Sequence, residues 1–187
     1  MLKDSHAGYG LITIALHWSC ALLIIILFGL GIYMTGLDYY SRWYYKAPAL
    51  HISLGIVLSA LMFAFVLWRI GNSNPGPLAS HSRSILLLAK LVKYTLYILI
   101  FIVLVSGYFL ATATGKPASL FGIIHIPAIA RLDSINVDRI GLVHELLAWA
   151  VVMLASLHAF AALAHHFVGR DRTLVRMLKP VGNDSTI

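Results

Sequence analysis

Four long apolar stretches constrain this chain more than any other feature. We place them at residues 11–34, 47–70, 85–113 and 140–168. Each is longer than the roughly 20 residues that an α-helix needs to cross the hydrocarbon core of a bilayer. Lipid offers no hydrogen-bond partners to an open backbone, so a spanning segment must be helical. We therefore predict an all-α integral membrane protein, a four-helix bundle that forms a single domain over residues 1–187.

The composition agrees with a membrane protein and excludes other classes. Hydrophobic residues make up 60% of the chain and charged residues 11%, whereas about a quarter of the residues in a soluble domain are charged. The net charge of +7 would suit nucleic acid, but the basic residues flank the apolar stretches. That distribution is typical of topology signals, so we expect no nucleic-acid partner. The single cysteine, Cys20, lies inside an apolar stretch and allows no internal disulfide.

The basic residues also predict the orientation of the chain. Nine of them fall on one side of the predicted membrane and five on the other. The richer side holds Lys3, Arg69, Arg83, Lys90, Lys93, Arg170, Arg172, Arg176 and Lys179, and the poorer side holds Arg42, Lys46, Lys116, Arg131 and Arg139. Cytoplasmic loops carry the excess of Lys and Arg. We therefore expect a multi-pass protein of a bacterial inner membrane with both termini in the cytoplasm.

The connections between the stretches differ in character. Residues 38–46 are rich in tyrosine and predict an aromatic belt at the outer interface. Residues 71–77 combine glycine, asparagine and proline and predict a loop. Residues 115–139 mix isoleucines with basic side chains. We expect this last segment to lie on the membrane surface as a short amphipathic helix.

Histidines are the candidate functional residues. The chain has nine, and five lie within the predicted spans: His17, His51, His144, His158 and His165. Ionisable side chains are costly in lipid and usually mark function there. Neutral imidazole is also a common ligand of metals and of haem iron.

The depths of four histidines match in two pairs. His158 follows His144 by fourteen residues, which is about 21 Å along a helix and nearly the same helix face. His51 lies at the depth of His144 near the outer side, and His17 lies at the depth of His158 near the inner side. The other pairings would join residues on opposite sides of the bilayer. The pattern predicts two bis-histidine sites, each for one haem b.

Histidines within a helix can also have roles that involve no haem. A single one is more often a hydrogen-bonded core residue than a ligand, but four at two matched depths favour metal or haem. Zinc fits poorly because its structural sites gather four ligands in one place. A proton relay would also favour carboxylates, and only Glu145 lies within a span. Gly55, one turn after His51, leaves room for a porphyrin.

The remaining histidines lie nearer the membrane surfaces. His165 lies near the inner edge, where it is either an interfacial side chain or a quinone ligand that hydrogen-bonds a carbonyl and helps to deliver protons. We expect His6 and His81 to be solvated and His125 to pack within the outer loop.

Several motifs carry a resemblance to a known family. They are His17-Trp18, His51-Ile52-Ser53-Leu54-Gly55, the stretch from Phe121-Gly122 to Pro127, His144-Glu145, Leu157-His158-Ala159, Ala161-Ala162-Leu163-Ala164-His165-His166-Phe167 and Asp171-Arg172-Thr173-Leu174-Val175-Arg176-Met177. On these residues the chain resembles the bacterial cytochrome b561 family over nearly its whole length. It is similar in particular to members that oxidise superoxide and reduce ubiquinone.

The resemblance implies cofactors and ligands. It implies two b haems, the outer one held by His51 and His144 and the inner one by His17 and His158. It also implies a quinone site near His165 on the cytoplasmic side. Lys93 stands where a histidine is expected in the family, and we assign it with His165 to the quinone site.

Together these features predict an oxidoreductase that transfers electrons from periplasmic superoxide to ubiquinone. Lys116, Arg131 and Arg139 lie on the outer side and would concentrate the superoxide anion by electrostatic focusing. His165 would act at the quinone. One alternative is an electron-transfer subunit that links a partner dehydrogenase or hydrogenase to the quinone pool, with the outer loop as its docking surface. Another is a haem-free membrane transporter.

Overall fold

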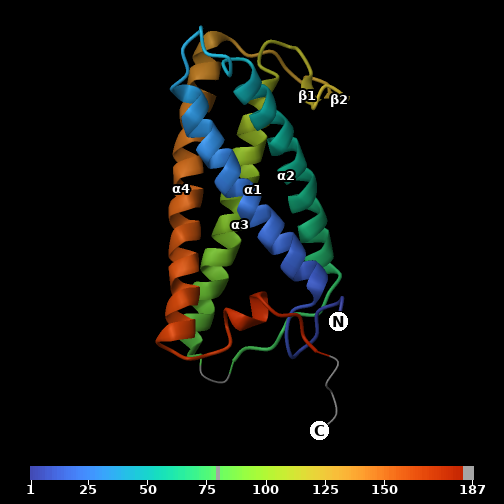
Figure 1. Cartoon of the computed structure of the whole chain (residues 1–187), viewed down its shortest axis with the longest axis vertical. Coiled ribbons are helices and arrows are strands. Elements are labelled where there is room, and N and C mark those ends of the chain that lie inside the picture. Colours follow the sequence, from blue (N-terminus) through green and yellow to red (C-terminus); the bar gives the residue numbers. More distant parts are fainter. Residues whose placement is uncertain (79–80, 183–187) are drawn as a thin grey trace. The chain divides into compact units, whose positions relative to one another are not determined.

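The computed structural model describes residues 1–78 and 81–182. Its secondary structure is dominated by long helices, which Figure 1 shows in chain order: α1 (Leu11–Thr35), α2 (Lys46–Ile70), α3 (Arg83–Ala111) and α4 (Ser134–Phe167). Each of these four is long and apolar enough to span a membrane. In the most apolar 18-residue stretch of each helix, at most 22% of the residues are buried within the protein. Most of the apolar surface is therefore available to lipid. The predicted all-α membrane fold with four spans is confirmed.

The start of α4 differs from the prediction, which placed it at Ile140 instead of Ser134. Asp133 caps the helix: its Oδ1 accepts a hydrogen bond of 2.8 Å from the backbone N–H of Asn136, and its Oδ2 accepts one of 2.9 Å from the Asn136 amide. An acidic cap satisfies N–H groups that the first turn leaves free. The first turns are polar, so hydropathy alone did not detect them.

The predicted amphipathic helix between α3 and α4 is wrong for the part that precedes Ser134. The segment instead forms an antiparallel hairpin of β1 (Ala118–Leu120) and β2 (Ile124–Ile126). The turn between them places Phe121 at φ 51° and Gly122 at φ 76°, a conformation that glycine adopts without strain. β-Branched isoleucines after such a turn favour a strand over a helix.

The hairpin is tied to α2 by Ser53, which is buried. The Ser53 hydroxyl lies 2.9 Å from the carbonyl oxygen of Ala49 and 3.2 Å from that of Ser119. Its oxygen accepts a hydrogen bond of 3.0 Å from the backbone N–H of Phe121. One side chain thus fixes both the strand and the turn of the hairpin.

The chain divides into two compact units, and every long helix contributes to both. Unit 1 comprises Met1–Ala21, Leu61–Thr95 and Leu154–Ile187, and unit 2 comprises Leu22–Ala60 and Leu96–Met153. In unit 1 the amino group of Met1 donates to the Val181 carbonyl over 2.9 Å, and the Val181 N–H donates to the Tyr9 carbonyl over 2.9 Å. The first residues of the chain therefore lie beside residue 181.

A buried carboxylate organises the N-terminal segment of unit 1. Asp4 is 8% exposed and accepts hydrogen bonds from the Gly10 N–H at 2.7 Å and the Thr13 hydroxyl at 2.9 Å. It also forms an ion pair with Arg69, near the end of α2. The Thr13 hydroxyl in turn accepts a hydrogen bond of 2.9 Å from the Trp68 indole. This network joins the start of α1 to the end of α2.

Replacing Asp4 with alanine should destabilise unit 1. The change removes the carboxylate partner of Arg69 in a mostly buried place and leaves Asn74 as a neutral partner. Loss of one partner of a buried ion pair costs about 3 kcal/mol or more. The expected result is a clearly lower midpoint for thermal unfolding of the detergent-purified protein, followed by helical circular dichroism. Asp138→Asn, at an exposed carboxylate of α4, is the matched control and should leave the midpoint unchanged. Equal midpoints for Asp4→Ala and Asp138→Asn would show that the network is dispensable.

Candidate functional site

His144, on the α4 part of unit 2, is held by two groups from α3. Its Nδ1 lies 2.9 Å from the Ser106 hydroxyl oxygen and 3.1 Å from the carbonyl oxygen of Val103. The Ser106 hydroxyl donates its own proton to the Val103 carbonyl over 2.9 Å. Ser106 is buried, so this arrangement is shielded from water.

These contacts favour one tautomer of His144. The Val103 carbonyl can only accept a hydrogen bond, so its contact with Nδ1 favours the tautomer that carries the hydrogen on that nitrogen. The Ser106 oxygen can then also accept from Nδ1. In neutral imidazole the other nitrogen, Nε2, then holds the lone pair. Ligating histidines in proteins show this pattern, with the second nitrogen bonded to a carbonyl or similar acceptor.

His51 on α2 lies opposite His144. The centroids of the two rings are 6.3 Å apart, with an interplanar angle of 72°. Two imidazoles on opposite sides of one metal ion would have centroids roughly 6 Å apart, given nitrogen–metal bonds of about 2 Å. The pair predicted from helix depth is thus brought together at a separation that fits axial ligation.

Two glycines let the neighbouring helices approach these rings. A Cβ atom at Gly107 on α3 would lie 3.0 Å from Cε1 of His144, and one at Gly31 on α1 would lie 3.5 Å from Cε1 of His51. An alanine at position 107 would therefore press on the His144 ring. A Cβ at Gly55 would meet no atom within 4 Å, which is compatible with the room expected there.

The second predicted pair, His17 and His158, lies in unit 1. His17 is half-buried on α1 and packs edge-on against Trp18, with centroids 5.4 Å apart. The Trp18 indole donates to the Met177 carbonyl over 2.7 Å, which ties this part of α1 to the segment after α4. His158 is exposed on α4 and therefore accessible to a ligand.

The donor set of each pair suits haem iron. Two neutral imidazoles without a thiolate or a carboxylate make a bis-histidine set of the kind that b-type cytochromes use. Each pair offers two nitrogen donors, so neither makes the four-ligand set of a structural zinc site. The residues present in both units fit the cofactor that the sequence predicts.

The three predicted superoxide-steering residues lie in unit 2, and all three are exposed. The side chain of Arg131 packs on Gly115, which has φ +81° and no Cβ to obstruct it. Arg139 lines a cavity of about 230 Å³ together with Ser106 and apolar residues of α3 and α4. The cavity thus joins a cationic side chain to the residue that orients His144.

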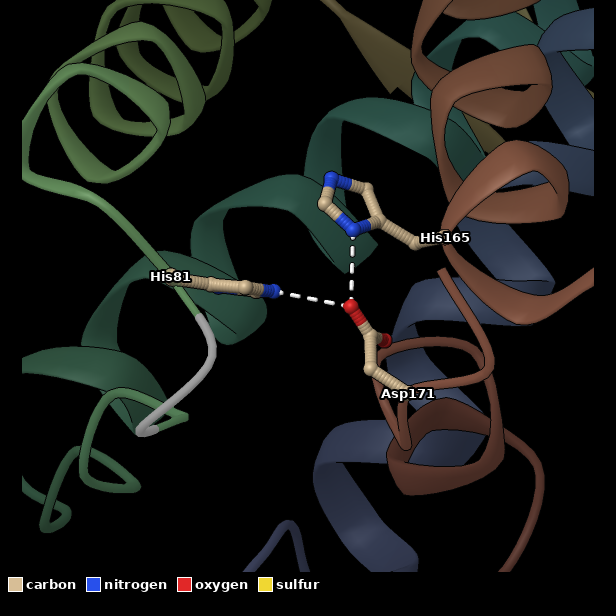
Figure 2. Close-up of side chains that lie close together, drawn as sticks. All are labelled: His81, His165 and Asp171. Atoms are coloured by element: carbon tan, nitrogen blue, oxygen red, sulfur yellow. Dashed lines mark hydrogen bonds and ion pairs between the residues drawn. The ribbon is translucent and has the colours of Figure 1, made fainter. Parts of the chain in front are cut away.

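Near the end of α4, in unit 1, His165 and His81 converge on Asp171 (Figure 2). Oδ2 of Asp171 lies 2.7 Å from Nδ1 of His165 and 3.0 Å from Nε2 of His81. The expectation that His81 is solvated is wrong, because only 12% of its side chain is exposed. Burial opposes ionisation of Asp171, but hydrogen bonds from Thr173, His81 and His165 lower the pKa of its carboxyl far below the ordinary value.

Lys93, the other residue predicted for quinone, is exposed on α3. Its ammonium group lies 4.7 Å from the centre of the Tyr94 ring, in a cation–π contact. The structure thus brings His165 together with His81 and Asp171, whereas the contact that it gives Lys93 is with Tyr94.

The polar partners of the histidines were not predicted from the sequence. Ser106 lies within a long apolar stretch, where nothing distinguishes it from a serine that packs between helices. A signal was present for Asp171, a lone carboxylate six residues after His165 and just beyond a helix end. No comparable signal marked His81, because its partner is ninety residues away.

Comparison with known proteins identifies the family of this chain. Residues 8–180 match the family model for prokaryotic cytochrome b561. Cytochrome b561 homolog 2 of Escherichia coli K12 is 44% identical over 94% of this chain and 94% of its own length. The probable superoxide oxidase CybB of Yersinia pestis is 30% identical over 92% of this chain and 97% of its own length. Cytochrome b561 homolog 1 of Escherichia coli K12 is 28% identical over 88% of this chain and 93% of its own length.

Four membrane spans and paired intramembrane histidines define a membrane-bound electron-transfer cytochrome. The chain belongs to the prokaryotic cytochrome b561 family. Membership implies binding of haem b and a multi-pass position in the inner membrane. It also argues against a haem-free transporter.

Proposed function

We propose that this protein transfers electrons from periplasmic superoxide to ubiquinone through two b haems. His51 and His144 would hold the outer haem, and His17 and His158 would hold the inner one. The observation that carries the proposal is the pairing of His144 with His51, whose ring centres are 6.3 Å apart, together with the contacts of His144 Nδ1 with Ser106 and Val103. Similarity to a probable superoxide oxidase supports the choice of donor.

The residues have separate tasks in this scheme. The bound haems supply reversible one-electron redox chemistry. Ser106 and Val103 keep the hydrogen of His144 on Nδ1, so that Nε2 remains a ligand. His165 hydrogen-bonds the quinone and helps to deliver protons, with Asp171 holding its Nδ1–H and thus its orientation. In this scheme both termini lie in the cytoplasm.

The test of this proposal is superoxide-driven reduction of ubiquinone by the purified protein. Superoxide is generated enzymatically, and quinol formation is followed with and without the protein. We expect quinol to form only with the protein, and its formation to stop when superoxide dismutase is added. No quinol above the protein-free rate would refute superoxide as donor, while leaving the haem ligands untouched.

Neutralising the three outer basic residues should slow the reaction with superoxide. In the Lys116→Gln, Arg131→Gln, Arg139→Gln triple variant we expect a second-order rate constant lower by about tenfold at low salt, because steering of a charged substrate raises on-rates by roughly 10- to 1,000-fold. The difference from the native protein should shrink as ionic strength rises. The measurement is stopped-flow haem reduction by superoxide.

A variant with two basic residues of unit 1 replaced, Arg170→Gln and Arg172→Gln, serves as a control for loss of positive charge elsewhere in the chain. It should retain the native rate constant and the native salt dependence. If the rate constant falls by the same factor in both variants, or falls in neither, then Lys116, Arg131 and Arg139 have no special part in attracting superoxide.

Ser106→Ala should raise the midpoint potential of the outer haem. The Ser106 oxygen accepts from Nδ1 of His144, which makes the ligand a stronger donor and favours ferric iron. Val103 remains as a partner, so we expect a shift of up to about 60 mV, the equivalent of a tenfold change for one electron. Spectroelectrochemical titration should show one haem moving and the other unchanged. Ser59→Ala, another serine bonded to a helix carbonyl, is the control.

A second candidate function is favoured by the hairpin. Several of its apolar side chains and those just after it are exposed, including Ile123 at 80% and Ile129 at 79%. Exposed apolar side chains of this kind suit a docking surface. In that case the protein would be the membrane subunit for a dehydrogenase or hydrogenase. A soluble partner should then co-purify from mildly solubilised membranes, and Ile123→Ser with Ile129→Ser should release it.

A further inference from the structure

We propose that His81, His165 and Asp171 form a binding site for a divalent transition-metal ion of the zinc class. Two ring nitrogens and one carboxylate oxygen converge there from three separate segments, all within 4.8 Å of one another. Among the residues that the structure describes, this is the group of His, Cys, Asp and Glu side chains that meets such a spacing.

The distances are close to those that a metal ion requires. Ligand atoms of a tetrahedral zinc ion lie about 3.3 Å apart, as follows from metal–ligand bonds of about 2 Å. Oδ2 of Asp171 is 2.7 Å from one imidazole nitrogen and 3.0 Å from the other. Both carboxylate-to-imidazole distances are therefore within about 0.6 Å of the tetrahedral spacing, and the two imidazole nitrogens lie within 4.8 Å of each other. Two histidines and one carboxylate with an open fourth position are a known zinc donor set.

The carboxylate is positioned by a contact outside the ligand set. The backbone N–H of Thr173 donates to Oδ1 of Asp171 over 2.8 Å, so that Oδ2 faces the two imidazoles, as Figure 2 shows. Such supporting bonds orient the ligands of metal sites.

The backbone before Asp171 is also unusual. Arg170 has φ 51°, a left-handed conformation that residues other than glycine seldom adopt. It reverses the chain directly after α4, and the Asp171 N–H then donates to the His165 carbonyl over 3.1 Å. Exposure of the ligand side chains falls from 27% for His165 to 9% for Asp171. The fold thus holds the carboxylate deep and leaves one histidine open to an entering ion.

Binding would regulate the proposed quinone site, and this part rests on the proposed function. Each imidazole must present a lone pair to the metal, so its hydrogen moves to the other ring nitrogen. The ion then binds to Nδ1 of His165 and to Oδ2 of Asp171. It replaces the hydrogen bond between these two atoms, which would otherwise orient the ring for proton delivery. Zinc should therefore slow quinone reduction.

Equilibrium dialysis of the purified haem-loaded protein against Zn²⁺, with metal quantified by mass spectrometry, tests the site directly. We expect one Zn²⁺ per chain at micromolar free zinc. Asp171→Asn, which is nearly isosteric, and His81→Ala should each weaken binding by about 10- to 100-fold. His6→Ala, at an exposed histidine of the same unit, should bind as the native protein does. The haem spectrum of each variant reports that it is folded.

Two results would overturn the proposal. One is zinc binding only at millimolar concentration, and the other is equal affinity in the native protein and Asp171→Asn. A changed pH profile of quinone reduction in Asp171→Asn without zinc binding would instead identify a hydrogen-bonded proton relay. Dialysis does not depend on quinone chemistry, so a failure of superoxide-driven quinone reduction would leave the zinc result standing.

Discussion

His158→Ala should reduce the haem content of the purified protein from about two to about one per chain and abolish quinone reduction. An inner haem held by His17 and His158 loses one of its two protein bonds, and a pentacoordinate haem in detergent is readily lost. The remaining haem, on His51 and His144, would still accept electrons from superoxide. The electrons would have no route to the quinone site near His165.

The measurement combines pyridine haemochrome analysis with single-turnover reduction by superoxide. The expected record is rapid reduction of about one haem per chain with no quinol formed. His166→Ala, at a neighbouring histidine of the same helix, is the matched control and should keep both haems. Full haem content and native quinone reduction in His158→Ala would contradict the assignment of His158 as a ligand of the inner haem.

His51→Ala should produce the opposite defect. It removes the partner that lies 6.3 Å from His144 between ring centres, and the outer haem should be lost, again leaving about one haem per chain. Superoxide should then reduce the protein very slowly, because its entry point is missing. Ubiquinol should still reduce the inner haem, because the quinone site lies in the other unit.

The two donors therefore separate the two variants. His51→Ala is reduced by quinol and scarcely by superoxide, whereas His158→Ala is reduced by superoxide and scarcely by quinol. His125→Ala, at an exposed histidine of β2, should resemble the native protein with either donor. If His51→Ala and His158→Ala behaved alike, the assignment of one ligand pair to each donor would be wrong.

The sequence was sufficient to predict the helices because lipid imposes a simple rule. A span must be apolar and about 20 residues long, and three of the four predicted spans agree with the structure within two residues at either end. The prediction of the fourth span was wrong at its start, because the turns after Asp133 are polar and their helical state depends on a cap. The hairpin was not predicted, because it depends on a turn at Phe121 and Gly122 and on hydrogen bonds to Ser53.

The candidate site divides in a similar way. Helix periodicity and depth were enough to pair His51 with His144, since both lie on regular helices. The partners that tune the histidines could not be found by the same means. Ser106 acts through a hydroxyl proton whose direction requires coordinates. His81 and Asp171 lie outside regular helix, where no period relates one residue to another.

The central claim is that each pair of imidazoles ligates one haem iron from both sides. It is tested most directly by haem-to-protein stoichiometry of the native protein, together with electron paramagnetic resonance of its oxidised form. The account predicts two b haems per chain, both low-spin with nitrogen ligands on each face. A single haem per chain, or a high-spin ferric signal from either haem in undamaged protein, would contradict it.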